Sequence, residues 1–186
     1  MNFSAWILKQ CGWRTVYSVS EPDKSVICVA PHTSNWDFII GKLSYWALSK
    51  DAGFLMKKSW FVFPLGSIFK AMGGIPINRS KRMSVTQQMV EEFNKREKLH
   101  IAITPEGTRK PNPDWKKGFY YIAKGAGISI QLAYLDYSKK EMGITEVFYP
   151  TDDEQADFKH IYDFYRKVKG RHPENFVIPD SSFQGK

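Results

Sequence analysis

The short apolar run from Val26 to Ala30 limits the fold of this chain more than any other stretch. Such a run is typical of a buried strand, and Pro31 ends that strand directly before His32. We expect Asp37 in the first turn of a helix that continues through Phe38, Ile39, Leu43 and Trp46. Within one unbroken helix His32 and Asp37 would point about 140° apart, because each residue turns by about 100°. With His32 on the turn after the strand instead, the Asp37 carboxylate can fold back onto the imidazole.

The pair formed by His32 and Asp37 has two interpretations. A histidine oriented by an acid is a general base, and the two residues are the last two members of a catalytic triad without its serine. In the structural interpretation, His32 is a hydrogen-bonded structural residue at a strand end, and Asp37 only stabilises the helix through the helix dipole. Two later strand ends bear on the choice.

Further short strands and helices follow along the chain. Apolar runs predict strands at 54–57, 73–79, 99–104, 128–135 and 144–149, and an edge strand at 15–19. Helical spacing predicts helices at 3–9, at 84–96 and around 119–123, and one that starts from a capping box at 151–154. From Arg171 onward, Pro173, Pro179 and Gly185 predict an irregular tail. No linker or repeat divides the chain.

The overall composition fits one globular domain with an anionic partner. A length of 186 residues suits a single domain, and 42% hydrophobic residues are enough for a core. The net charge of +8 favours phosphates, acidic lipid surfaces or nucleic acid as partners. Cys11 and Cys28 are too few for a disulfide framework, and no C-x-x-C pair suggests zinc. We therefore expect a reducing compartment.

Two aromatic segments raise the question of a membrane. Phe3, Trp6 and Ile7 lie at helical spacing, as in a helix that dips into a membrane surface or one that packs on the core. Residues 57–63 mix lysines with aromatics, as in a nucleic-acid stacking platform or a membrane-facing or acyl-facing surface. The start of the chain does not read as a cleavable signal, and no apolar stretch reaches the roughly 20 residues needed to cross a bilayer. We expect a protein that is soluble or lies on a membrane surface.

The two later strand ends carry cations and a glycine turn. The strand at 73–79 starts with two glycines and ends at Arg79. The strand at 99–104 is followed directly by Pro105, Glu106, Gly107, Thr108 and Arg109. A glycine beside a carboxylate, a hydroxyl and a guanidinium at a strand end can form a tight anion-binding turn.

Together and in this order, the three strand ends resemble the glycerolipid acyltransferase family, whose best known members make phosphatidic acid from lysophosphatidic acid. The matching pieces are His32 to Asp37 for H-x-x-x-x-D, 73–79 for the glycine-to-arginine second motif, 105–109 for P-E-G-T-R, and 115–118 for the lysine–glycine segment that follows it. The chain departs from the family at Pro31, where many members have asparagine, and at 128–132, where the usual proline is absent. Its N-terminal membrane-binding helices are reduced to one candidate.

The resemblance implies an α/β fold and an acyl transfer reaction. The fold would be a single domain over 1–186, with a mixed, mostly parallel sheet flanked by helices, a membrane-surface helix at 1–14 and an irregular tail at 171–186. The reaction would move a fatty acyl group from coenzyme A or acyl carrier protein to the hydroxyl of a lysophospholipid, foremost 1-acylglycerol-3-phosphate, giving phosphatidic acid. Another lysolipid or an amino-lipid is the alternative acceptor. The thioester is already activated, so neither a metal nor another cofactor is needed.

The resemblance also implies a role for each motif residue. His32 would deprotonate the acceptor hydroxyl, and Asp37 would hold its ring in the useful tautomer. Arg79 and Arg109 would bind the anionic headgroup, because a guanidinium can donate two parallel hydrogen bonds to phosphate. The three residues between the motif proline and its arginine would assist: Glu106 would orient an arginine or the acceptor hydroxyl, Gly107 would admit the ligand, and Thr108 would donate a hydrogen bond. The enzyme would work at the cytoplasmic face of an anionic membrane, with no nucleic-acid partner.

Three rival classes make different predictions. A non-catalytic lipid-binding or acyl-binding protein on the same scaffold would bind without turnover. A basic RNA-binding domain would show salt-sensitive RNA binding, but several of its cations already have motif or helix-end explanations. A serine hydrolase needs a G-x-S-x-G elbow, which is absent, and Ser34 lies too close to His32 in sequence.

Overall fold

The computed structural model describes residues 2–77 and 83–179, apart from the side chain at position 57. Within these residues the chain forms one seven-stranded sheet and six α-helices. The strands are β1 (Arg14–Tyr17), β2 (Lys24–Ala30), β3 (Gly53–Lys57), β4 (Gly74–Ile77), β5 (Leu99–Ile103), β6 (Ser129–Asp136) and β7 (Glu141–Phe148). The helices are α1 (Phe3–Gln10), α2 (Trp36–Ala47), α3 (Leu65–Ala71), α4 (Val85–Lys95), α5 (Gly118–Ala126) and α6 (Glu154–Tyr165), with short 3₁₀ turns η1 (Lys58–Trp60) and η2 (Pro173–Asn175).

The strand order places β2 at the centre of the sheet. The order is β1-β7-β6-β2-β5-β3-β4, and every neighbouring pair is parallel except β6 and β7. Val26 of β2 pairs with Ile101 of β5 on one side and with Ile130 of β6 on the other. The carboxyl ends of β2, β5 and β6 therefore meet at one edge, where open α/β sheets bind their ligands. This confirms the predicted α/β fold with a mixed, mostly parallel sheet flanked by helices.

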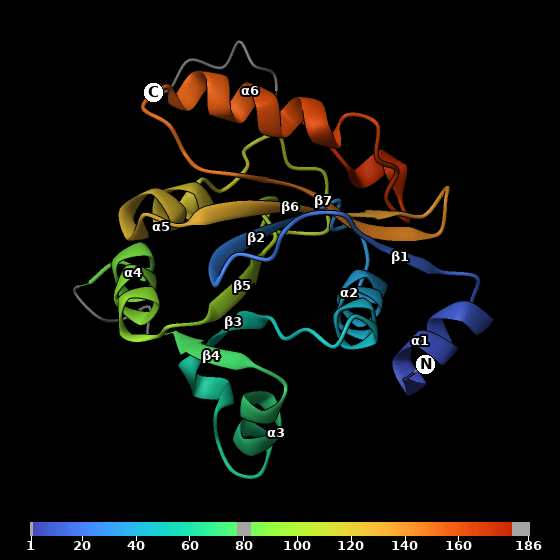
Figure 1. Ribbon diagram of the computed structural model, residues 1–186, viewed down its shortest axis with the longest axis horizontal. Helices are drawn as coiled ribbons and strands as arrows, with labels where there is room; N and C mark the ends of the chain where they lie inside the picture. The colour runs from blue at the N-terminus through green and yellow to red at the C-terminus, as the bar shows by residue number, and fades with distance from the viewer. Residues whose placement is uncertain (1, 78–82, 180–186) are drawn as a thin grey trace.

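Helices cover both faces of the sheet and create two cores. Figure 1 shows α6 on one side of the sheet and α1 and α2 on the other. Val26, Cys28 and Ala30 face the core formed with α4, α5 and α6, and Ile27 faces the core formed with α1 and α2. All four are fully buried, which is why β2 is apolar on both faces rather than alternating. Each large aliphatic side chain buried in this way contributes roughly 1.5–3 kcal/mol.

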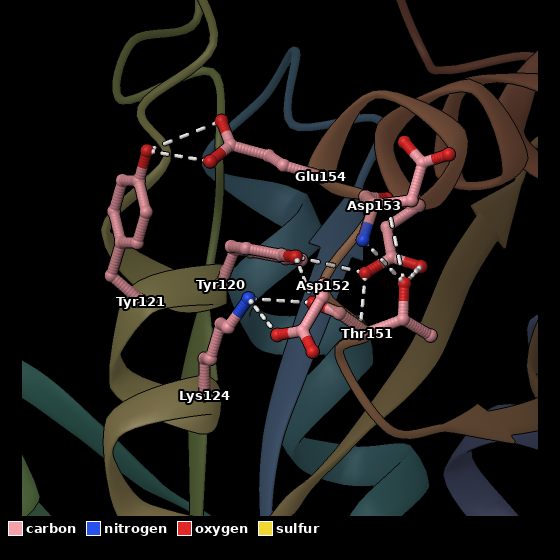
Figure 2. Close-up of polar contacts among 8 residues, drawn as sticks. Tyr120, Tyr121, Lys124, Thr151, Asp152, Asp153 and Glu154 are labelled. Atoms are coloured by element: carbon pink, nitrogen blue, oxygen red, sulfur yellow. Dashed lines mark hydrogen bonds and ion pairs between the residues drawn. The ribbon is translucent and has the colours of Figure 1, made fainter.

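The start of α6 differs from the prediction. We expected a capping box at 151–154, but the N-cap residue is Asp153, whose side chain accepts a hydrogen bond from the backbone nitrogen of Ala156. Glu154 is the first helical residue, and its carboxylate accepts hydrogen bonds from Tyr121 on α5 instead of reaching back to the cap (Figure 2). A capping box is present instead at α4, between Ser84 and Gln87.

The two ends of the chain agree in part with their predictions. The expected N-terminal helix is present as α1, and its membrane contact stays a prediction. Residues 171–179 contain η2 and neither an α-helix nor a strand, and 180–186 lie outside the described residues. None of the helices within 2–77 and 83–179 is long and apolar enough to cross a bilayer.

Candidate active site

His32 and Asp37 meet at the carboxyl end of β2. His32 lies on the loop between β2 and α2, and Asp37 lies in the first turn of α2. The distance between His32 Nδ1 and Asp37 Oδ2 is 3.4 Å. The Asp37 side chain is 2% exposed and the His32 side chain 22% exposed, so the acid is sealed in the protein while the imidazole is open on one side. The geometry predicted from the spacing is present, and the catalytic roles stay a prediction.

The Asp37 carboxylate is held by hydrogen bonds at both oxygens. Oδ2 accepts from the backbone nitrogens of Thr33 at 2.7 Å and Ser34 at 2.8 Å. Oδ1 accepts from the hydroxyl of Tyr137 at 2.6 Å. Burial acts to raise the pKa of Asp37, but these hydrogen bonds and that of His32 outweigh it and lower the pKa below its ordinary value. Asp37 is therefore an anion beside the imidazole at neutral pH.

Glu106 binds the backbone of His32, whereas Asp37 contacts its ring. Both of its carboxylate oxygens accept the backbone N–H of His32, at 2.8 and 3.1 Å. Glu106 is 3% exposed, and burial raises its pKa to about 7 against the opposing effect of that hydrogen bond. The loop that carries Glu106 is closed by Asn112, whose side-chain amide donates to the Glu106 carbonyl at 2.8 Å. In the structure Glu106 thus fixes the position of the histidine, and its predicted contact with an arginine or an acceptor hydroxyl stays a prediction.

The rest of the third motif lies at the same edge, where Pro105 is buried, Thr108 is half-buried, and Gly107 and Arg109 are exposed. Gly107 has φ of +65°, a left-handed conformation that favours glycine. Thr108 accepts a hydrogen bond from the backbone nitrogen of Lys110, and Arg109 is exposed on the same loop. Arg79 lies outside the described residues. The structure therefore joins His32, Asp37 and Glu106, and the proposed arginine site stays a prediction.

A cavity of about 600 Å³ lies between α2 and the sheet and starts at the His32–Asp37 pair. Its lining is mostly apolar, with Phe38 from α2, Leu55 from β3, and Leu135 and Met142 from β6 and β7. A larger hollow of about 990 Å³ lies near the start of β5, beside Glu21, Lys50 and His100. It is lined by charges of both signs and includes neither His32 nor Asp37, so we place the candidate site at the smaller cavity. Within 2–77 and 83–179 no three or more His, Cys, Asp or Glu side chains form a group that could hold a metal ion.

Sequence reasoning missed Tyr137. It follows β6, and its hydroxyl reaches Asp37 because β6 and β2 are neighbours with the same direction. The one available signal was its place just after the end of the predicted strand at 128–135. That signal becomes useful only once the strand order is known.

The comparisons with known proteins identify the family of this chain. A family model described as Acyltransferase matches residues 14–134, which include β1 to β5, most of β6, the His32–Asp37 pair and the Glu106 loop. This match covers more than half of the chain, so the chain belongs to this acyltransferase family and is an acyltransferase. The family predicted from the three motifs is thereby confirmed.

One solved structure has a similar fold. The chain is similar to the crystal structure of the 1-acyl-sn-glycerophosphate (LPA) acyltransferase PlsC from Thermotoga maritima, with a TM-score of 0.62 and 19% identity over 87% of this chain and 73% of that chain. At this identity the likeness shows the fold. No curated protein sequence matches the chain.

Proposed function

We propose that this acyltransferase moves a fatty acyl group from a thioester to the hydroxyl of a lysophospholipid in phospholipid biosynthesis. The proposed acceptor is 1-acylglycerol-3-phosphate, the proposed donor is acyl-coenzyme A or acyl carrier protein, and the product is phosphatidic acid. One observation carries the proposal: the imidazole of His32, backed by the buried anion Asp37, lies at the start of an apolar cavity. The similar Thermotoga maritima protein is a 1-acyl-sn-glycerophosphate acyltransferase, which supports the choice of acceptor.

The dyad supplies the proton transfers that the reaction needs. With Asp37 at Nδ1, the Nε2 nitrogen of His32 is the atom that takes the proton of the acceptor hydroxyl. The hydroxyl oxygen forms a bond to the thioester carbonyl carbon, the carbon–sulfur bond breaks, and the imidazolium returns the proton to the leaving thiolate. The Asp37 anion stabilises the imidazolium while it exists. No covalent intermediate with the protein is required.

The cavity under α2 suits the fatty acyl chain. Its lining from α2 and the sheet is mostly hydrocarbon and phenyl surface, and its volume is about 600 Å³. A chain that entered it would leave its thioester carbonyl next to His32, because the imidazole belongs to the lining. The polar acceptor would then approach from the exposed loop that carries Arg109.

The direct test is a product assay with a substrate panel. The protein is incubated with long-chain acyl-coenzyme A or acyl carrier protein and with phosphorylated, zwitterionic and amino lysolipids, and the products are identified by mass. We expect phosphatidic acid from 1-acylglycerol-3-phosphate. Acylation of a different lysolipid instead would show that the proposed acceptor is wrong. Lipid binding without any acylated product would support the non-catalytic rival.

We expect Arg109→Ala to weaken acceptor binding rather than chemistry. The exposed guanidinium would lose its charge-assisted hydrogen bonds to phosphate, which contribute about 1.5–3 kcal/mol. The KM for the phosphorylated lysolipid should therefore rise roughly tenfold or more, with kcat changed little. Arg79→Ala, expected from the sequence to act in the same way, is measured beside it.

The matched control for this experiment is Arg96→Ala. Arg96 is an exposed arginine paired with Glu92 on α4, and it precedes the start of β5, whereas the Glu106 loop follows the end of that strand. A rise in KM that is equal in all three variants would indicate a general charge effect. An unchanged KM in Arg109→Ala would move the headgroup site elsewhere.

We further propose that the protein binds to the cytoplasmic face of an anionic membrane. Exposed aromatic and aliphatic side chains gather on α1, α2 and the segment 60–68, all on the side of the sheet opposite α6 (Figure 1): Phe3, Trp6, Trp36, Ile39, Trp46, Trp60, Phe63 and Ile68. Exposed Lys58 and Lys70 flank the segment 60–68, and the whole chain carries a net charge of +8. Apolar side chains with adjacent cations are what an anionic bilayer surface binds.

We expect the double variant Trp60→Ser, Phe63→Ser to lose most of its binding to vesicles that contain phosphatidylglycerol. The two side chains are 56% and 92% exposed, so their removal costs the fold little. Loss of their burial in the bilayer should lower the partition coefficient by roughly tenfold or more. Cosedimentation measures it, with Tyr149→Ser, 62% exposed and in the loop before α6, as the control. Equal binding by both variants and the wild type would exclude this surface.

A further inference from the structure

Tyr137 connects the end of β6 to the buried acid of the dyad. Its hydroxyl donates to Asp37 Oδ1 at 2.6 Å, across 100 residues of sequence. The other carboxylate oxygen already accepts from two backbone nitrogens and faces the imidazole. Among the described residues, Tyr137 is the only one that donates a hydrogen bond to Oδ1. The two oxygens of one carboxylate thus have different partners.

Several parts of the chain fix Tyr137 in this position. Its backbone nitrogen donates to the carbonyl of Lys169 at 2.9 Å. Its ring packs edge-on against Trp13, with 4.9 Å between the ring centroids. Tyr137 is therefore held independently of Asp37, by the segment after α6 and by the loop before β1.

The same segment after α6 also holds the loop that carries His32. The backbone nitrogen of His172 donates to Thr33 Oγ1 at 3.2 Å. Arg171 lies over the ring of Trp36, with its guanidinium carbon 5.7 Å from the centroid. Gly170 packs so closely on this loop that an added Cβ would lie 2.9 Å from Thr33 Oγ1. One short segment thus sets the distance between Tyr137 and the start of α2.

The hydroxyl of Tyr137 stays a donor through the neutral pH range. Burial and the hydrogen bond to Asp37 raise the pKa of Tyr137, and the nearby Arg171 opposes this only in part. The phenol therefore remains protonated, and its proton points to the carboxylate. An Asp37 oxygen without this donor would be a buried, unpaired anionic atom, which would favour rotation of the carboxylate.

We propose that Tyr137 is a positioning residue for acyl transfer: by holding Asp37 Oδ1, it keeps Oδ2 directed at His32 Nδ1. The inference rests on the proposed function, in which the His32–Asp37 pair performs the proton transfer. Tyr137 does not belong to the lining of the apolar cavity, so it acts through Asp37 and not through the substrate.

The test compares Tyr137→Phe with Tyr134→Phe. Tyr134 donates an equally short hydrogen bond, 2.6 Å, to the carboxylate of Glu141, in the same β6–β7 region but without contact to the dyad. In Tyr137→Phe we expect kcat to fall roughly tenfold, as loss of one hydrogen bond to a charged group implies. The KM for both substrates should stay unchanged. Tyr134→Phe should keep the kcat of the wild type.

A second measurement does not depend on turnover. Carbon-13 NMR of labelled aspartate follows the titration of Asp37 in the intact protein, and we expect a higher pKa for Asp37 in Tyr137→Phe but not in Tyr134→Phe. An unchanged kcat in Tyr137→Phe would overturn the inference, and so would an unchanged Asp37 pKa. An equal fall of kcat in both tyrosine variants would also overturn it, because the effect would then be one of general stability.

His32→Ala separates this inference from the proposed function. If His32→Ala is inactive and Tyr137→Phe keeps its full kcat, the positioning role alone is wrong. If His32→Ala keeps the turnover of the wild type, the proposed function fails, and the positioning role fails with it. The expected combination is an inactive His32→Ala, an impaired Tyr137→Phe and an intact Tyr134→Phe.

Discussion

His32→Ala is expected to abolish the release of coenzyme A in the presence of the lipid acceptor. The imidazole is the group at the start of the cavity that can accept the hydroxyl proton, and general base catalysis contributes roughly 10²- to 10⁴-fold. Its side chain is 22% exposed, and its ring contact is with Asp37, so the alanine variant should still fold. Release of the thiol is measured with a thiol reagent, and folding by circular dichroism and thermal unfolding.

His160→Ala is the matched control for this experiment. His160 is an exposed histidine on α6 that pairs with Glu146, on the opposite side of the sheet from α2 (Figure 1). The variant removes an imidazole that also has a carboxylate partner. This imidazole does not line the cavity. We expect the control to retain full turnover. Turnover by a correctly folded His32→Ala would remove His32 from its proposed role.

The local features of the site could be predicted because each depends on a short stretch of sequence. The apolar run before Pro31 predicted β2, and Leu99 to Thr104 predicted β5 to within one residue. The five-residue spacing predicted the contact between His32 and Asp37, because a strand end and a helix start are both local signals. The motif residues that follow β2 and β5 therefore lie at the same edge of the sheet.

Two contacts that the sequence did not reveal depend on neighbours far away in the sequence. The role of Glu106 as a double acceptor for the His32 backbone requires β5 to lie beside β2, and Tyr137 requires β6 on the other side. Helix α3 was missed for a local reason, because Pro64 and Gly66 interrupt the apolar pattern there. Gly66 is needed for packing, since an added Cβ would lie 2.6 Å from the backbone of Phe61.

The second large effect is expected for Asp37→Asn, which removes the charge of the acid and preserves its shape. The amide oxygen can take the place of Oδ2, where two backbone N–H groups donate, and the amide NH₂ can donate to Tyr137, whose hydroxyl is also an acceptor. The fold and the ring orientation should therefore survive. What is lost is the anion 3.4 Å from the imidazole, which at an effective dielectric constant of about 20 stabilises an imidazolium by roughly 5 kcal/mol. We expect kcat to fall about a thousandfold, with KM nearly unchanged.

Asp157→Asn is the control that makes this result interpretable. Asp157 is also buried, and it also accepts from a tyrosine hydroxyl and a backbone nitrogen, those of Tyr120 and Thr151, but it lies on α6 away from the dyad. Both variants should lose similar stability in thermal unfolding, whereas only Asp37→Asn should lose turnover. If Asp37→Asn kept the kcat of the wild type, the charge would have no part in catalysis. If both variants lost turnover equally, destabilisation would explain the loss, because only an electrostatic role predicts a difference between two such similar carboxylates.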